Sequence, residues 1–329
     1  MSPEVDGHGA LGDRLGELVG SRHPVSAVAV VSPEGTSIAS RGTDLDSDFE
    51  IGSVSKVITG LLYRDAIDRG EVTPGSTLGQ LLPLGATPAA HITLHALSIH
   101  SSGLPRLPKS AHPLRRTVQL WRHGSNPYGE SLTELIEQAA GVELGTPRPR
   151  YSNFGFELLG HAIARAAGTT YAELLRERIT EPLGLDHTYA PLTPGDLRPG
   201  ALAGRSNHGK TQEPWTGEAI APAGGIRSTI GDMARLTEAL LDGSAPGVSA
   251  LDPVAAFGMG GQIGAAWITV QAKRASITWH NGGTGGFRSW MGVNRAAGTG
   301  VVILSATSVS VDRHGFRMLT DPSARSLIS

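Results

Sequence analysis

The hydrophobic pattern places strand-like segments at both ends of the chain and helix-like segments between them. Near the start, residues 11–19 have helical spacing of apolar positions, and the β-rich run 25–31 returns through a Pro-Glu-Gly turn as 36–41. Toward the end, short apolar runs separated by turn residues predict an antiparallel meander, at 266–271, 276–279, 287–294 and 300–306. Residues 313–319 are expected to close the chain as a helix.

The middle of the chain reads as helices joined by loops rich in Pro and Gly. The strongest prediction is a helix over residues 53–69, which has helically spaced apolar residues and Gly70 as a stop signal. Further helices are expected at 132–140, 154–167, 171–179 and 229–241.

These elements predict an α+β fold, an α/β sandwich. Its antiparallel sheet is built from both termini, is flanked by terminal helices, and carries a mostly helical insertion lobe. We assign residues 1–60 and 205–329 to a discontinuous sheet domain and residues 61–204 to the helical lobe. A cleft between two such lobes is the natural place for an active site.

Composition narrows the classes of function. The chain has 329 residues, 39% of them hydrophobic, and a net charge of -2, which is typical of a globular protein with a large core. The near-neutral charge gives no case for a nucleic-acid or membrane-surface partner. There are no cysteines, so disulfides and thiolate chemistry are excluded.

Targeting signals and metal-ligand clusters are not apparent in the sequence. The first 30 residues contain no apolar run of signal-peptide length, and no stretch approaches the ~20 apolar residues of a membrane span. We therefore expect a cytoplasmic protein. His91, His95 and His100 have suggestive spacing, but no carboxylate cluster joins them. We predict no metal site and no other cofactor.

Ser53 and Lys56 lie three positions apart at the start of the predicted helix. Of the four lysines, only Lys56 has a serine three positions before it. Residues spaced in this way share one face of a helix, so the amine would lie beside the hydroxyl. A lysine whose pKa is lowered by burial or by cations can take the serine proton. Taken alone, the pattern is a weak signal of catalysis, and the alternative is a capping serine followed by a solvated lysine.

Tyr151 and Asn153 form a second candidate pair, just before the helix predicted at 154–167. Of the five tyrosines, only Tyr151 has Asn two positions later. A tyrosine near cations can shift toward phenolate and act as a general base, and Asn153 can bridge the lysine and a substrate carbonyl. The alternative is a packed tyrosine followed by a helix-capping asparagine.

A third candidate motif, His280-Asn281-Gly282-Gly283, follows the strand predicted at 276–279. Asn281 and Gly282 would bind substrate along the strand edge. The N–H of Gly283 could complete an oxyanion hole with that of Ser53. His280 could donate to a substrate carboxylate or hold the proton network of the tyrosine. The alternative is a Gly-rich turn after a strand.

The three motifs, each found once and in this order, resemble the serine β-lactamase and penicillin-binding-protein superfamily on its class C side. Other family-like segments are LSIHSSGLP at 97–105, EPLGL at 181–185, PAGGIRST at 222–229 and HNGGTGGF at 280–287. The resemblance covers nearly the whole chain and implies a β-lactamase-like fold.

The resemblance also implies a mechanism. Ser53 would form an acyl-enzyme, Lys56 and Tyr151 would share the proton transfers, and the amides of Ser53 and Gly283 would hold the oxyanion. Many β-lactamases carry Lys-Thr-Gly where this chain has His-Asn-Gly, which argues against efficient β-lactam hydrolysis.

The resulting hypothesis is an enzyme that cleaves a small ester or amide with water. The alternative is a transacylase that moves the acyl group to an amine or alcohol in secondary metabolism, for example in capuramycin-type nucleoside antibiotic assembly. A third possibility is a non-catalytic β-lactam-binding sensor. Several side chains are further candidates for lining the substrate cavity, namely Arg288, Trp290, Trp121, Tyr128 and Trp215, whereas His100 is expected to support a turn.

Overall fold

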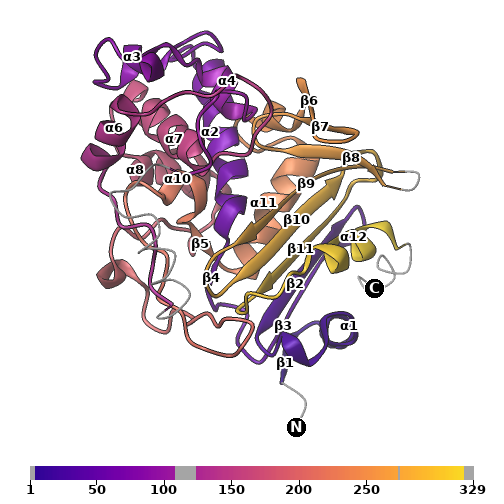
Figure 1. Ribbon diagram of the computed structural model, residues 1–329. Helices are drawn as coiled ribbons and strands as arrows, with labels where there is room; N and C mark the ends of the chain where they lie inside the picture. Colours follow the sequence, from indigo (N-terminus) through magenta and orange to yellow (C-terminus); the bar gives the residue numbers. More distant parts are fainter. Residues whose placement is uncertain (1–3, 108–123, 273–274, 322–329) are drawn as a thin grey trace.

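The fold is organised around one nine-stranded antiparallel sheet whose strands come from both ends of the chain (Figure 1). The computed structural model describes residues 4–107, 124–272 and 275–321. The strand order is β1-β3-β2-β11-β10-β9-β8-β7-β6. The bounds are β1 (Val5–Gly7), β2 (Ser26–Ser32), β3 (Gly35–Arg41), β6 (Ala255–Phe257), β7 (Gly261–Ile263), β8 (Ile268–Ala272), β9 (Ala275–Gly283), β10 (Arg288–Asn294) and β11 (Thr299–Ser305).

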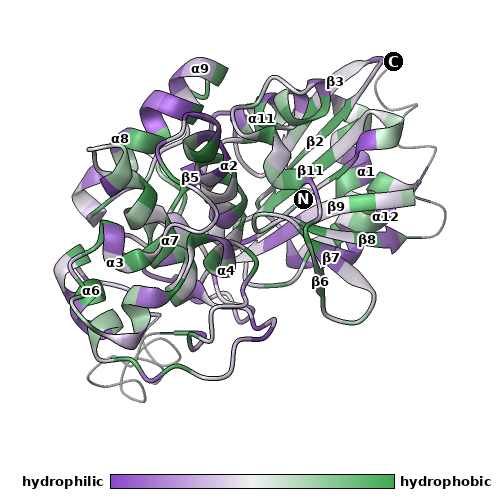
Figure 2. Cartoon of the chain, turned by 90° about the horizontal axis from the view of Figure 1, so that it is seen from above, coloured by the Kyte–Doolittle hydropathy of each residue, from purple (hydrophilic) through white to green (hydrophobic). Residues whose placement is uncertain are grey.

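The pairing of β2 with β11 joins the two ends of the chain at the centre of the sheet. Every residue of both strands is buried, because helices cover the sheet on both faces. In Figure 2 the residues of β2 are mainly hydrophobic. A strand covered on both faces is expected to be apolar along its whole length rather than at alternate positions.

Successive residues of these strands pack into two different cores. Val28 and Ile303 contact the smaller core under α1 (Gly9–Val19) and α12 (Asp312–Thr320). Ala29 and Leu304 belong to the larger core, which includes α11 (Ile230–Asp242). This alternation is the side-chain period of a strand, and it explains the terminal helices that flank the sheet. The predicted architecture is confirmed.

Helices of the middle segment lie to one side of the sheet (Figure 1). They are α3 (Leu78–Leu81), α4 (Leu94–Ser98), α6 (Leu132–Ala140), α7 (Asn153–Ala166), α8 (Tyr171–Leu175), α9 (Glu181–Leu183) and α10 (Ala221–Gly224). The helix predicted over 171–179 is in fact α8 followed by a π-helical turn, Arg176–Thr180. The division into domains at residues 60 and 205 stays a prediction.

The helix predicted over 53–69 starts later than expected. Ser53 lies in a 3-10 turn, Gly52–Val54, and the α-helix α2 runs over Ser55–Asp68. Its buried residues occur on all sides, since α2 packs against α7 and α10 as well as the segment that follows α11. A helix buried all round is typical of the centre of a large core.

The strand predicted at 276–279 is longer than expected. β9 continues through the His280 motif to Gly283, and Gly283 pairs with Arg288 of β10. The motif therefore lies within a strand and not in a turn after one. Three short strands of the nine-stranded sheet were missed, β1, β6 and β7, because three residues carry too little periodicity to be recognised. Among the described residues, no helix is both long and apolar enough to cross a bilayer.

A buried ion network anchors the segment that leads into the 3-10 turn. Arg227 of β5 (Arg227–Ser228) donates from Nε to Asp48 Oδ2 at 2.9 Å and from Nη1 to Glu50 Oε1 at 3.2 Å. Glu50 belongs to β4 (Phe49–Glu50), which pairs with β5. The Arg227 side chain is only 1% exposed, and it also donates to the Leu202 carbonyl. This network joins three segments that are distant in sequence, and one of them, residues 48–50, leads directly to the turn that carries Ser53.

We expect Arg227→Met to destabilise the fold by about 3–5 kcal/mol, because two buried carboxylates would lose their counter-charge. Chemical denaturation gives the free energy of unfolding directly. The control is Arg176→Met, which removes ion pairs with Glu177 and Glu181 whose side chains are about half exposed and should cost no more than about 1 kcal/mol. Equal effects of the two changes would show that the network does not anchor this segment.

Candidate active site

Two glycines allow the turn that carries Ser53 to lie against strand β9. Gly52 has a φ of 51°, and a Cβ there would lie 2.5 Å from the nitrogen of Gly283. A Cβ on Gly282 would lie 2.0 Å from the carbonyl oxygen of Ile51. Only glycine fits such close backbone contacts. The contact places Gly283 beside Ser53, and both residues line the same cavity.

Lys56 lies behind Ser53 in a fully buried position. Its Nζ donates to Ser53 Oγ at 3.2 Å and to the carbonyl oxygen of Ala223 at 2.5 Å. Burial lowers the pKa of Lys56 to about 7, an effect that Glu157 opposes and Arg106 increases. The free amine is therefore populated near neutral pH, which a base for the serine proton requires.

Tyr151 lies on the other side of the hydroxyl and hydrogen-bonds to Ser53. Lys56 Nζ is 5.0 Å from the centre of its ring. Burial raises the pKa of Tyr151 above its usual range, and neither the hydrogen bond to Ser53 nor the charge of Arg106 offsets this. The expected shift toward phenolate is thus wrong for this structure: Tyr151 is a neutral phenol, able to donate and to relay a proton.

Asn153 makes no hydrogen bond to the lysine, contrary to the sequence-based expectation. Its Nδ2 donates to the hydroxyl of Tyr128 at 3.0 Å. Its Oδ1 is buried without a hydrogen-bond partner among the described residues. The amide is therefore held in place by a tyrosine rather than by the amine.

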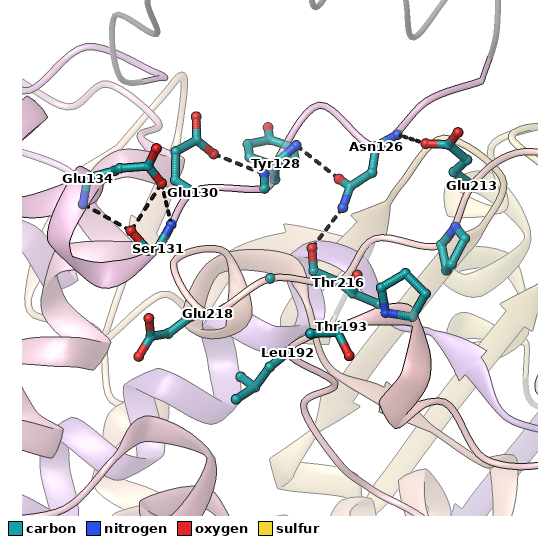
Figure 3. A pocket seen from close by; sticks show the side chains of 14 residues that line it. Asn126, Tyr128, Glu130, Ser131, Glu134, Leu192, Thr193, Glu213, Thr216 and Glu218 are labelled. Atoms are coloured by element: carbon teal, nitrogen blue, oxygen red, sulfur yellow. Dashed lines mark hydrogen bonds between the residues drawn. The ribbon is translucent and has the colours of Figure 1, made fainter.

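Tyr128 separates the cavity at Ser53 from a second cavity of about 640 Å³. Figure 3 shows Asn126 bridging the wall of this second cavity, from the Tyr128 backbone to the carbonyl of Thr216. Glu213 and Glu218 accept hydrogen bonds from backbone N–H groups. Because these polar groups are used in holding the loop, they serve to position Tyr128.

The motif on β9 places its residues on two sides of the strand. His280 is buried, with Nδ1 2.6 Å from the Asn281 carbonyl and Nε2 without a partner among the described residues. Burial lowers its pKa to about 4, so the ring is neutral, and it does not line the cavity. The proposed donation from His280 to a substrate carboxylate therefore has no support. Asn281, which was expected to bind substrate, donates from its side chain to Asp312 Oδ2 at 2.8 Å.

A cavity of about 440 Å³ opens in front of Ser53. The sequence-predicted residues that line it are Ser53, Tyr151, Asn153, Asn281, Gly282, Gly283 and Arg288. Lys56 and His280 lie behind this lining. Trp215 lines the cavity and packs edge-on against Tyr128, with ring centres 4.7 Å apart.

Other sequence candidates fall outside the cavity. Trp290 is fully buried in the smaller core, and Trp121 lies outside the described residues. The ring of His100 packs against that of Tyr151 at an interplanar angle of 39°, with ring centres 4.6 Å apart. It adopts a positive φ of 57°, which agrees with its expected place in a turn. In the described ranges, no group of three or more His, Asp or Glu side chains is arranged to hold a metal ion.

Sequence reasoning missed three contributors to the site: Arg106, Glu157 and the carbonyl of Ala223. Glu157 had a signal, since it is a lone carboxylate in the otherwise apolar run 154–160. Arg106 directly follows the LSIHSSGLP segment and lines the cavity. The Ala223 carbonyl carries no sequence signal, because any residue offers the same acceptor.

Comparisons with known proteins agree with this geometry. A model of the beta-lactamase family matches residues 13–319. The D-alanyl-D-alanine-carboxypeptidase/endopeptidase AmpH of Escherichia coli (strain K12) is 34% identical over 196 residues, which cover 58% of this chain and 48% of AmpH. The unguisins hydrolase ungD' of Aspergillus campestris is 26% identical over 304 residues, covering 82% of this chain and 54% of that protein.

The chain thus spans about half the length of these two relatives. Among solved structures, a class C beta-lactamase mutant superimposes with a TM-score of 0.79 at 17% identity, over 93% of this chain and 95% of that one. The fold is therefore that of a class C beta-lactamase. Because the family model matches nearly the whole sequence, the chain belongs to the beta-lactamase family.

Proposed function

We propose that this protein is a serine hydrolase that cleaves a small ester or amide through an acyl-enzyme on Ser53. The observation that carries the proposal is the buried Lys56 amine, 3.2 Å from Ser53 Oγ and with a pKa of about 7. A serine nucleophile requires a base within hydrogen-bond reach, and this arrangement supplies one. Membership in a family of serine hydrolases supports the same conclusion.

Acylation would begin with attack of Ser53 Oγ on the substrate carbonyl carbon while its proton passes to Lys56 Nζ. The N–H groups of Ser53 and Gly283 would stabilise the oxyanion. When the tetrahedral intermediate collapses, the bond to the leaving group breaks, and the leaving group takes a proton from the Tyr151 hydroxyl. Lys56 then returns its proton to Tyr151. In the second half of the reaction, Tyr151 first passes its proton to Lys56, and a water molecule attacks the acyl carbon while giving a proton to Tyr151. The bond to Ser53 Oγ then breaks, Oγ takes the proton from Lys56, and the acid is released.

The cavity supports a compact, partly polar substrate. Tyr128 and Trp215 offer aromatic surface for a planar or apolar group. Asn281 is already bonded to Asp312 and replaces the threonine hydroxyl that many β-lactamases use to hold the antibiotic carboxylate. This substitution favours an ester or amide other than a β-lactam. One relative is named a carboxypeptidase and another a hydrolase, which supports water as the acyl acceptor.

Transfer of the acyl group to an amine or alcohol is the second candidate. It requires room for an acceptor beside the acyl-enzyme, and the second cavity reaches Tyr128 from the other side. We expect water to be the acceptor: an added amine should not raise turnover of a p-nitrophenyl ester. Mass spectrometry of the products decides the point, since an amide product with a saturable rise in turnover would establish a transacylase instead.

The nucleophile is tested by intact-mass spectrometry after treatment with a fluorophosphonate or an activated ester. We expect one covalent adduct on Ser53 and a burst of p-nitrophenol, both of which Ser53→Ala should abolish. The control is Ser244→Ala, an exposed serine after α11, which should keep both. An adduct that persists in Ser53→Ala would place the chemistry elsewhere.

The pH dependence tests the base. Because only the free amine of Lys56 accepts a proton, kcat/KM should rise about tenfold per pH unit below the pKa and level off above about 7. Burst rates measured between pH 5 and 9 give the profile. Lys56→Arg keeps the charge but holds no free amine, so we expect a loss of about 10²–10⁴-fold. A profile that is flat through neutrality would rule out Lys56 as the base.

A further inference from the structure

The short helix α10 supplies the fixed contact of the lysine amine. The carbonyl oxygen of Ala223 on this helix accepts from Lys56 Nζ at 2.5 Å. The amine also donates to Ser53 Oγ at 3.2 Å, but that oxygen is the atom that would move onto the substrate. A lysine side chain has many rotamers, so the place of the Ala223 carbonyl decides where the amine lies during the reaction.

The carbonyl group just before that of Ala223 is held by Thr59 of α2. Thr59 follows Lys56 by three positions, so the two side chains share a face of the helix. The Thr59 side chain is fully buried, and its Oγ1 donates to the carbonyl oxygen of Pro222 at 2.7 Å. Thr59 and Lys56 therefore bond to consecutive carbonyl groups of α10, and a shift of one carbonyl displaces the other.

Tyr171 of α8 determines which way the Thr59 hydroxyl points. Its phenol oxygen lies 2.6 Å from Thr59 Oγ1, and its side chain is only 3% exposed. A buried phenol is expected to donate its proton, and Thr59 Oγ1 is its partner among the described residues. The single hydroxyl proton of Thr59 then goes to a carbonyl group. Pro222 at 2.7 Å is nearer than Ser55 at 3.2 Å.

Other contacts hold the same segment against α2. Ser55 Oγ accepts from the backbone N–H of Ile226 at 3.2 Å. Gly160 of α7 allows a close approach, since a Cβ there would lie 2.2 Å from Pro222 Cβ. α10 has only four residues, too few to be stable through its own hydrogen bonds. Its position therefore depends on such contacts, and that of Thr59 is the one next to the carbonyl that Lys56 uses.

We propose that Thr59 is a positioning residue for the Ser53–Lys56 pair: its hydroxyl holds the Pro222 carbonyl and thereby places the Ala223 carbonyl against the lysine amine. This deepens the proposed function, on which the catalytic significance of Thr59 rests. Thr59 and Pro222 do not line the cavity in front of Ser53. Thr59 therefore affects the rate of acylation and not the binding of substrate.

The test compares two substitutions of Thr59 by stopped-flow burst kinetics with p-nitrophenyl acetate and the full-length protein. Thr59→Val keeps nearly the same shape and removes the hydroxyl. We expect its acylation rate constant to fall about 10–100-fold with the dissociation constant of the ester unchanged, because a misplaced catalytic group costs this much. Thr59→Ser retains the hydroxyl and should keep most of the wild-type rate.

Thr237→Val is the matched control. Thr237 is fully buried on α11, and its Oγ1 donates to the carbonyl oxygen of Met233 at 2.7 Å. The change removes the same kind of hydrogen bond from another helix, so it should lower the Tm and leave the acylation rate unchanged. Equal losses of rate in Thr237→Val and Thr59→Val would reveal a general effect of stability and overturn the proposal.

Tyr171→Phe provides a second test that leaves α2 intact, so it applies even where Thr59→Val does not fold. The Thr59 proton is then free to turn to the Ser55 carbonyl. We expect the acylation rate to fall by about fivefold, the equivalent of one neutral hydrogen bond, again with unchanged ester binding. A wild-type rate in Tyr171→Phe would contradict the role of this network.

Two results with Thr59 itself would also refute the positioning role. One is a wild-type rate in Thr59→Val. The other is an equal loss in Thr59→Ser, which would mean that the methyl group matters and the hydroxyl does not. A missing burst in the wild-type protein would instead refute the proposed function, so the two failures are distinguishable.

Discussion

The burial of one amine determines the chemistry of the whole site. An ammonium group in a dry, low-dielectric position is strongly disfavoured, so Lys56 has a pKa of about 7 rather than the usual value for lysine. The same burial keeps Tyr151 a protonated phenol and His280 a neutral ring. Burial thus leaves Lys56 available as a base, Tyr151 as a proton donor and His280 uncharged.

The sheet and its glycines keep this buried site in contact with substrate. The N-terminal strand β2 pairs with the C-terminal strand β11, which places the Ser53 turn beside β9 although more than 200 residues separate them. Gly52 and Gly282 remove the side chains that would hold the two backbones apart. Arg227, neutralised by Asp48 and Glu50, fixes the strand that enters the turn. Rigidity of this kind is needed because an oxyanion hole works only when its donors are preorganised.

The polar network around Asn153 distinguishes this site from the family pattern that its sequence suggests. The side chain is bonded to Tyr128 and not to the lysine, and Tyr128 is positioned by the loops around the second cavity. Lys56 receives its fixed contacts from Ser53 and the Ala223 carbonyl instead. Asn153 Oδ1 is buried without a hydrogen-bond partner among the described residues.

The sequence alone determined the fold class, the terminal strands and helices, and the three motifs around Ser53, Tyr151 and His280. These follow from local periodicity, turn residues and rare spacings, all of which are written along the chain. Only the tertiary structure decided the start of α2 at Ser55, the extension of β9 to Gly283, and the partners of Asn153 and Asn281. It also decided that Tyr151 is a phenol. These properties depend on burial and on contacts between residues far apart in sequence, which no local pattern encodes.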